Sequence, residues 1–438
     1  MDYRKTRKYL IITNNINILH TMKVFKFGGA SVKDANGIKN VASIIEKYGE
    51  KNLVVVVSAT GKTTNALEEV IHAYFKNEDA KAKFDIVKNN HHTICKDLFG
   101  NESHDVFDKL QNIYAEVDWQ LEEDRKESYN YVYDQIVSQG ELISSVILSA
   151  YLNEVGVSNT WLDVRDVMKT DDTYREAIVD WTKTQALMNT VVKPLTKDSI
   201  AVTQGFIGCT AENCTTTLGR EGSDYTAAIF ANMLDAENQT IWKDVPGVMN
   251  GDPRVFDDAV FMDEISFNEA VEMTFYGATV IHPKTIKPLQ NKNIPLLVKS
   301  FINPEGKGTK VGGNDNNLPP IRIVKNSQAL ITLHTKDFSF VEDDVVATIF
   351  NSFSKANLKL NMMQQGAISF EAVVDNIPEK IEKIKADLQD KFDFVIEENL
   401  SILTIRHYTN FDLINKHKGD KNAILEQRRP STYQGLLV

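Results

Sequence analysis

Cysteine, long apolar runs and positive charge are all scarce in this sequence. The 438-residue chain has three cysteines, which form no CxxC pair and no zinc-binding spacing, so we expect reduced thiols in a cytoplasmic protein. No apolar run reaches the roughly 18 residues that a transmembrane helix requires. The net charge of −11 argues against a general nucleic-acid binder and against a protein that attaches to anionic membranes. We therefore predict a cytoplasmic protein with neither nucleic-acid nor membrane partners.

The remaining composition is typical of a globular protein of two or three domains, with 42% apolar and 25% charged residues. The first 21 residues are basic and then mildly apolar, but asparagines interrupt the apolar part and no small-residue cleavage site follows. Because Met22 directly precedes the first strand-like run, we predict that residues 1–21 are an N-terminal extension outside the folded core.

Strand-like and helix-like segments alternate through the first 300 residues, which predicts an α/β fold with a mostly parallel sheet sandwiched by helices. Leu53–Val57 is a continuous apolar run, as expected of a strand that is buried on both faces. The region 76–130 is charged, helix-rich and without motifs. Further strand-like runs are Asn159–Val164, Ser199–Gln204, Thr240–Trp242 and Ile294–Val298.

Proline, glycine, asparagine and lysine dominate Asn303–Pro320, which predicts a linker between domains. We accordingly divide the folded chain into a first domain at 22–310, a linker at 311–320 and a C-terminal region at 321–438.

The C-terminal region has the order strand, helix, strand, strand, helix, strand, which is the ferredoxin-like α+β arrangement. These segments are Ala329–His334, Val345–Ala356, Leu358–Met363, Ala367–Val374, Pro378–Lys391 and Phe392–Ile396. Two later strand-like runs, Leu400–Arg406 and Thr432–Val438, are too few for a second complete copy. We therefore predict one complete unit followed by a truncated one.

The segment Lys23–Ser31 predicts a strand, a glycine-rich turn and the start of a helix. Its glycines, Gly28 and Gly29, let backbone N–H groups approach a phosphate, and the helix end adds partial positive charge. Lys26 can reach the phosphate oxygens from just before the turn. Taken alone, the segment fits an ordinary turn with a solvated lysine equally well. Apolar residues then recur at helical spacing, at Ile38, Val41, Ile44 and Ile45.

Three more glycine-containing turns follow strands, and the second and third of them carry Arg, Asp or Ser. They lie at Thr203–Gly208, Thr217–Ala228 and Trp242–Arg254. Since parallel sheets bind ligands at the carboxyl ends of their strands, these turns predict an anion site at that edge.

On these motifs the sequence resembles the aspartate kinase family of the amino acid kinase fold. The C-terminal region resembles the regulatory ACT domains of that family, which are ferredoxin-like amino-acid sensors. The resemblance implies a catalytic domain at 22–310 and an ACT region at 321–438. The matching stretches follow the family's order and spacing, and they are Lys26–Ser31, Ser58–Asn65, Gly140–Glu141, Thr203–Gly208, Gly219–Asp224, Asp244–Arg254 and Gly277–Pro283.

The resemblance implies transfer of the ATP γ-phosphoryl group to the side-chain carboxylate of L-aspartate. The products would be 4-phospho-L-aspartate and ADP, in the first step of lysine, threonine and methionine biosynthesis. A carboxylate with a pKa of about 3.9 is already ionised at pH 7, so the reaction needs no general base. It needs charge neutralisation and alignment, which calls for lysine, glycine N–H donors and Mg²⁺. We assign no residue of the chain as a metal ligand.

The resemblance also implies roles for individual residues. Lys26 would hold the transferring phosphoryl group, and Asp224 would organise this lysine and the metal-bound phosphates. Arg220 would bind the α-carboxylate of aspartate, and Glu141 would accept its ammonium group. The other aspartate-binding residues would be Ser58, Thr64, Phe206 and Ser223. In addition to Lys26, the ATP-binding residues would be Gly28, Gly29, Ser31, Lys243, Asp244, Met249, Arg254 and Thr279.

Each of the charged residues also has a purely structural explanation. Arg220 and Asp224 fit a salt bridge at the start of a helix, and Glu141 fits an ordinary acidic residue in a first helical turn.

Four positions depart from the family pattern. The family usually has threonine at Ala30 and at Lys243, and tyrosine at Met249. A phosphate-facing lysine of the family is replaced by Thr279. We expect Lys243 or Lys284 to supply the missing charge.

Two other functions remain open from the sequence. A kinase for acetylglutamate, glutamate or a nucleotide monophosphate is disfavoured by the Gly219–Tyr225 turn and by the ACT region. A non-catalytic amino-acid sensor is compatible with Thr279, but it has no need of Lys26, Arg220 and Asp224.

ACT units usually pair edge to edge between chains, which implies a homodimer or a larger assembly. An effector would bind near Asp337–Asp344 and Leu360–Gly366, and lysine and threonine are the two candidates. Lysine-sensing members usually have an acid near Asn361, so asparagine there weakens the assignment of lysine.

Overall fold

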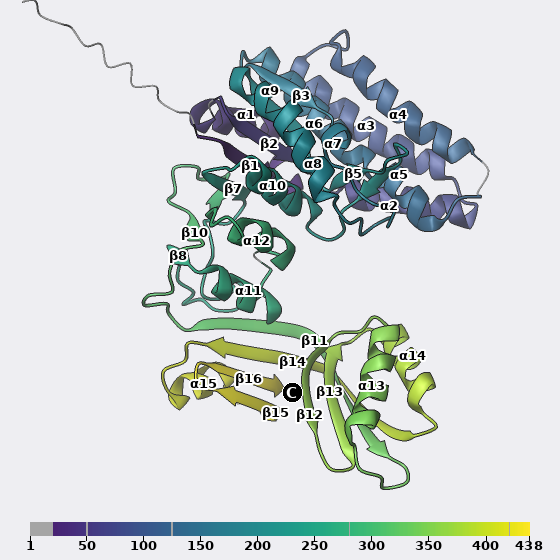
Figure 1. Cartoon of the computed structure of the whole chain (residues 1–438), viewed down its shortest axis with the longest axis vertical. Coiled ribbons are helices and arrows are strands. Elements are labelled where there is room, and N and C mark those ends of the chain that lie inside the picture. The colour runs from purple at the N-terminus through teal and green to yellow at the C-terminus, as the bar shows by residue number, and fades with distance from the viewer. Residues whose placement is uncertain (1–20, 50, 124–125, 280, 420) are drawn as a thin grey trace, which may run out of the picture.

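The computed structural model describes residues 21–49, 51–123, 126–279, 281–419 and 421–438. The predicted N-terminal extension lies outside these residues except for Thr21. The described chain forms an N-terminal part around an eight-stranded sheet and a C-terminal part around a six-stranded sheet (Figure 1).

The eight-stranded sheet is mostly parallel, as the alternating pattern predicted. Its order is β3-β4-β2-β1-β7-β9-β10-β8, and only β9 and β10 pair in the antiparallel sense. Every residue of β2 is buried, because side chains on both faces of the sheet are covered. The strands are β1 (Lys23–Phe27), β2 (Leu53–Val57), β3 (Asn159–Leu162), β4 (Ile200–Gln204), β7 (Asn238–Lys243), β8 (Glu264–Ile265), β9 (Leu296–Ser300) and β10 (Thr309–Val311). A separate two-stranded hairpin consists of β5 (Ile207–Cys209) and β6 (Thr215–Thr217).

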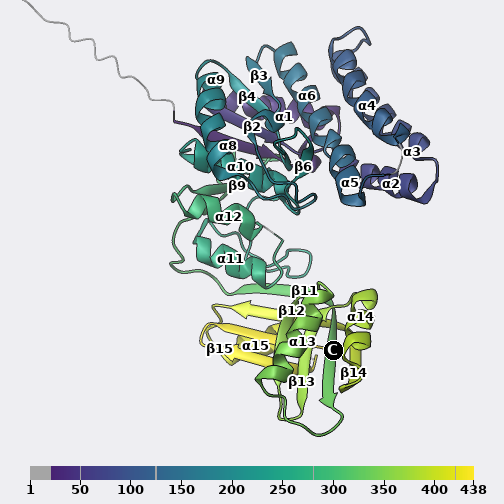
Figure 2. The ribbon, with the colours of Figure 1, turned by 45° about the vertical axis from the view of Figure 1, so that its right-hand side comes forward.

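Helices surround this sheet. Helix α6 packs against β2, β3 and β4, whereas α10 packs against β1, β2 and β7. The charged region 76–130 is helical, as expected, and its helices α3 and α4 stand at one side of the N-terminal part (Figures 1 and 2). The helices are α1 (Ala35–Tyr48), α2 (Thr63–Lys76), α3 (Ala80–Phe99), α4 (Val106–Glu122), α5 (Tyr129–Val137), α6 (Gln139–Glu154), α7 (Val164–Val167), α8 (Trp181–Leu187), α9 (Lys193–Asp198), α10 (Gly222–Met233), α11 (Phe267–Phe275) and α12 (Pro283–Gln290), with a 3₁₀ turn η1 (Gly29–Val32) and a π-helical turn η2 (Met188–Val192).

The six-stranded sheet is antiparallel, with the order β12-β13-β11-β14-β16-β15. Its first unit has the predicted ferredoxin-like order of strands and helices. None of the helices in the described part of the chain is both long and apolar enough to cross a bilayer. The strands are β11 (Ile321–Thr335), β12 (Leu360–Gln365), β13 (Ser369–Asp375), β14 (Phe392–Arg406), β15 (Ala423–Arg429) and β16 (Thr432–Leu437), and the helices are α13 (Asp343–Lys355), α14 (Pro378–Leu388) and α15 (Phe411–Lys418).

Two 15-residue strands, β11 and β14, connect the two halves of this sheet. Their pairing shifts register between Lys325 and Gln328. Before the shift, Ile321–Lys325 pairs with the end of β14, beside β16 and β15. The second half therefore uses the start of β11 as one of its strands, in addition to those that follow β14.

The structure corrects several details of the sequence prediction. Strand β10 lies inside Asn303–Pro320, so part of the stretch assigned to a linker belongs to the large sheet. Helix α15 and strand β15 were not predicted, because their buried apolar residues, Ile414 and Leu425, stand among charged residues. The domain boundaries themselves stay a prediction.

A buried ion pair joins the two parts of the chain. Arg406, at the end of β14, donates to both carboxylate oxygens of Glu269 on α11, at 2.7 Å each. The Arg406 side chain is 10% exposed and that of Glu269 is 3% exposed. Arg406 also pairs with Glu272 at 2.8 Å. Because the geometry is bidentate and shielded from water, this pair fixes α11 against the C-terminal sheet.

We predict that Glu269→Ala lowers the free energy of unfolding by about 3 kcal/mol, because it leaves the buried Arg406 guanidinium without its main partner. Glu122→Ala is the matched control, since it removes an exposed carboxylate that pairs with Lys81 at 2.7 Å. The control should leave the free energy of unfolding almost unchanged, because solvent screens an exposed ion pair. Urea unfolding followed by circular dichroism measures both, and equal effects would contradict the prediction.

Candidate active site

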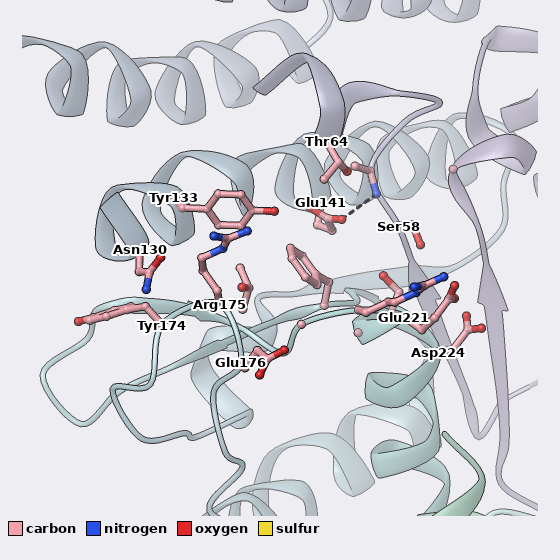
Figure 3. Close-up of a pocket in the computed structure, with 18 of the residues that line it drawn as sticks. Ser58, Thr64, Asn130, Tyr133, Glu141, Tyr174, Arg175, Glu176, Glu221 and Asp224 are labelled. Carbon is pink, nitrogen blue, oxygen red and sulfur yellow. Dashed lines mark hydrogen bonds between the residues drawn. The ribbon is translucent and has the colours of Figure 1, made fainter. Parts of the chain in front are cut away.

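The parallel strands of the large sheet end at one edge, and the predicted turns meet there. Strands β1, β2 and β4 lie next to one another in register, so the residues that follow them emerge together. A cavity of about 820 Å³ opens at this edge (Figure 3). Its lining includes all eight residues predicted to be catalytic or aspartate-binding, namely Lys26, Ser58, Thr64, Glu141, Phe206, Arg220, Ser223 and Asp224.

Lys26 and Asp224 form a close ion pair inside this cavity. The Lys26 ammonium lies 2.6 Å from Oδ1 of Asp224, and the two side chains are 10% and 1% exposed. Asp224 belongs to the first turn of α10, where the helix dipole favours negative charge. Its Oδ2 is buried and accepts no hydrogen bond from a described residue. The pair leaves a charged lysine at the end of β1 and a carboxylate oxygen free to take a cation.

Two glycines allow the turns around this pair to touch. A Cβ atom on Gly29 would stand 2.6 Å from the Ala59 carbonyl oxygen, so only glycine lets the turn after β1 contact the turn after β2. A Cβ atom on Gly205 would stand 2.4 Å from Cβ of Ser223, so glycine lets the turn after β4 contact the start of α10.

The Glu141 side chain, in the first turn of α6, is buried and only partly satisfied. Its Oε1 accepts a hydrogen bond from the Ala59 N–H at 3.2 Å, whereas its Oε2 is buried without a hydrogen-bond partner among the described residues. Burial raises the pKa of Glu141 to about 8, although the Ala59 N–H and the charge of Lys26 oppose this shift. The carboxyl group is therefore mostly neutral at pH 7, and an ammonium group of a ligand would favour its ionised form.

Most of the predicted ATP-binding residues lie outside this cavity. Only Lys26 and Gly29 line it, whereas Gly28, Ser31, Lys243, Asp244, Met249, Arg254 and Thr279 do not. The Ser31 hydroxyl donates to the Gly28 carbonyl at 2.6 Å and is buried, so it stabilises the turn. The Arg254 guanidinium pairs with Asp252 at 2.7 Å and is 85% exposed. The roles of these residues stay predictions.

Lys284 lies close to the Arg220 turn. Its ammonium donates to the Leu218 carbonyl at 3.4 Å, and a Cβ atom on Gly219 would stand 3.5 Å from it. Thr279, which replaces the lysine of the family, is exposed. Lys284 and Lys243 are the two candidates for the charge that is missing at Thr279. Of these, Lys284 lies beside the cavity.

The sequence prediction missed one end of the cavity. Asn130 and Tyr133 come from α5, and Tyr174, Arg175 and Glu176 come from the loop after α7 (Figure 3). Neither segment carries a motif, so no signal in the sequence points to them. The lining also includes Glu221 beside Arg220, and Asn357 from the turn between α13 and β12 in the C-terminal part.

Comparisons with known proteins agree with this geometry. A sequence profile described as the amino acid kinase family matches residues 21–300. Lysine-sensitive aspartokinase 3 of Escherichia coli K12 is 33% identical over 354 residues, which cover 80% of this chain and 78% of that protein. The maize chloroplastic bifunctional aspartokinase/homoserine dehydrogenase 1 is 32% identical over 300 residues, but the chain spans only 32% of its length.

Solved structures match over almost the whole chain. The crystal structure of Escherichia coli aspartokinase III with aspartate and ADP has a TM-score of 0.79 and 28% identity, covering 95% of this chain and 96% of that one. The structure of the same enzyme with lysine and aspartate has a TM-score of 0.80 with the same coverage and identity. The chain therefore belongs to the amino acid kinase family. Within that family, it is one of the aspartate kinases.

We predict that Glu141 makes the stability of the protein fall as the pH rises towards 9. A pKa raised above the unfolded value means that the neutral carboxyl group stabilises the folded state at low pH, and that this contribution is lost as the pH rises through about 8. Between pH 6 and pH 9 the wild type should lose about 3 kcal/mol more than Glu141→Gln, whose amide does not titrate. Urea unfolding at both pH values tests this, and parallel pH dependences would refute it.

Proposed function

We propose that this protein transfers the γ-phosphoryl group of ATP to the side-chain carboxylate of L-aspartate and forms 4-phospho-L-aspartate and ADP. The observation that carries the proposal is the meeting of the Lys26–Asp224 pair, the buried Glu141 carboxyl group and Arg220 in one cavity. An amino acid with an acidic side chain has one group for each of these partners.

Binding and orientation are the main tasks of the residues. Arg220 would receive the α-carboxylate and Glu141 the ammonium group, which leaves the side-chain carboxylate directed towards Lys26. That carboxylate is ionised at pH 7 and attacks without a general base. Lys26 and the Gly29 N–H would stabilise the charge on the transferring phosphoryl group.

Mg²⁺ bound with ATP would neutralise phosphate charge in this reaction. Among the described residues, no group of three or more His, Cys, Asp and Glu side chains could hold a metal ion by itself. The buried Oδ2 of Asp224, which accepts no hydrogen bond there, fits a single protein contact to a phosphate-bound ion.

We predict that the purified protein releases ADP with Mg-ATP and L-aspartate, but not with glutamate or N-acetylglutamate. Hydroxylamine should trap the acyl phosphate that forms. Lys26→Met should lower kcat about 10³-fold, because it removes the charge that stabilises the transferring group. Its matched control is Lys23→Met at the partly buried start of the same strand, which lies outside the cavity and should keep the wild-type rate. Aspartate binding without turnover in the wild type would instead identify a non-catalytic sensor.

We also predict that Lys284 supplies the charge that Thr279 lacks. Lys284→Met should lower kcat about 10-fold or more, since a cation beside the Gly219 turn is lost. Adding Thr279→Lys to this variant should restore most of the rate. Lys243→Met tests the other candidate. If neither lysine variant changes the rate, another group neutralises the phosphate charge.

The C-terminal region bears on the assembly of the protein and on its regulation. We infer a homodimer or larger assembly through the ACT region, a cytoplasmic location, and a place in lysine, threonine and methionine biosynthesis. Lysine and threonine are the candidate effectors. Asn361 is already engaged, because it accepts from the Lys325 ammonium at 3.0 Å and donates to Asp375 at 3.0 Å. This network favours a weak response to lysine, whose amine would compete with Lys325.

A further inference from the structure

Asp134, in α5, is a fully buried carboxylate that the proposed reaction does not use. It accepts three hydrogen bonds: from the Arg175 N–H at 2.9 Å, from the Thr217 N–H at 2.8 Å and from the Thr217 hydroxyl at 2.7 Å. Burial raises its pKa to about 6, and the hydrogen bonds and the charge of Arg175 oppose this shift. At pH 7 the group is thus mostly ionised, with three donors from two separate segments directed at it.

Both segments lead into the cavity. Thr217 ends β6 and is followed by the turn that carries Arg220, whereas Arg175 belongs to the loop after α7. The Ala177 N–H donates to the Thr217 carbonyl at 2.9 Å, and a Cβ atom on Gly219 would stand 3.2 Å from the Arg175 carbonyl oxygen. The two segments therefore pack backbone against backbone, with Asp134 joining them.

The backbone conformation and the side-chain contacts of Arg175 set it apart at this junction. Its φ is +73°, a left-handed backbone conformation that residues with a side chain seldom adopt. Its guanidinium lies 4.4 Å from the centre of the Tyr133 ring, at the end of the cavity away from Asp224 (Figure 3). No carboxylate of the described ranges lies within ion-pair distance of it. Among the described residues, the Arg175 guanidinium thus contacts aromatic rings and has no carboxylate as an ion-pair partner.

We propose that Asp134 is a positioning residue for substrate binding, which fixes the Arg175 loop against the Arg220 turn and so places both guanidinium groups at the cavity. The substrate in this statement is that of the proposed function. Arg220 would then receive the α-carboxylate of aspartate, and Arg175 would add a second positive charge to the cavity that attracts this acidic substrate. Asp134 acts through them and does not touch the substrate itself.

Variants of Asp134 and Thr217 test this role by separating the KM for aspartate from the KM for ATP. Asp134→Asn places an amide where three donors converge, and Thr217→Val removes one donor while keeping the shape of the side chain. Each should raise the KM for aspartate at least about 10-fold while the KM for ATP changes less than about 2-fold, because the displaced turn carries Arg220, which is proposed to bind aspartate and not ATP. Thr217→Ser retains the hydroxyl group and should bind aspartate as the wild type does.

Thr216→Val is the matched control for a merely structural effect. Thr216 is the neighbouring residue of the same strand, is equally buried, and bonds through its hydroxyl to the Thr170 hydroxyl at 2.7 Å, away from Asp134. It should lower the melting temperature without raising the KM for aspartate. The proposal is overturned if Thr216→Val and Thr217→Val have equal KM values for aspartate. It is also overturned if Asp134→Asn raises the KM for aspartate and the KM for ATP equally.

A double-variant cycle tests whether Asp134 acts through Arg175. Arg175→Gln should raise the KM for aspartate, and the effect should be smaller in the Asp134→Asn background, since coupled residues are not additive. Fully multiplicative effects exclude Arg175 as the group that Asp134 positions. If Asp134→Asn does not fold, the same cycle is run with Thr217→Val.

Calorimetry measures aspartate binding without turnover, so it tests the role of Asp134 independently of the proposed kinase reaction. If the wild type binds aspartate without turnover, the kinase function fails, and the same variants are compared by their Kd for aspartate. If the wild type neither turns over nor binds aspartate, both proposals are overturned.

Discussion

The buried ion pair between Lys26 and Asp224 is the interaction on which the candidate site depends. It joins the carboxyl end of β1 to the first turn of α10, which lies almost two hundred residues later in the chain. Since a buried lysine or aspartate is costly without its partner, the pair fixes β1 and α10 relative to each other. The other turns are arranged around it, and Gly29 and Gly205 allow them to come close enough.

The cavity holds its charged groups in different ways, and each suits a different part of an acidic amino acid. Lys26 is paired and shielded, which keeps a positive charge where phosphate would arrive. Glu141 is mostly neutral at pH 7, so it would ionise as an ammonium group binds, and a proton would leave. Arg175 and Arg220 are exposed at the cavity and reach it from turns that Asp134 joins. Burial, more than the number of charges, separates these roles.

Much of the fold could be predicted from the sequence. Alternating apolar segments predicted the mostly parallel sheet, and the C-terminal order of strands and helices predicted a ferredoxin-like unit. The length of β11 and β14 could not be predicted, because their exposed middle residues interrupt the apolar pattern and their pairing partners are distant in sequence. Helix α15 was missed for a similar reason, since a single buried residue, Ile414, gives no periodic signal.

The sequence by itself determined which residues could hold a phosphate and an amino acid, because glycine turns and charged residues must follow strands to do so. Lys26 with the Gly28–Gly29 turn is recognisable in this way, whereas the roles of Glu141, Arg220 and Asp224 are implied by the resemblance to aspartate kinases. Only the tertiary structure decided that Asp134 lies against Thr217. It also decided that the buried carboxyl group of Glu141 is mostly neutral at pH 7, whereas that of Asp134 is mostly ionised. Burial and hydrogen bonding depend on segments that lie far apart in the chain, so they cannot be predicted from the local sequence.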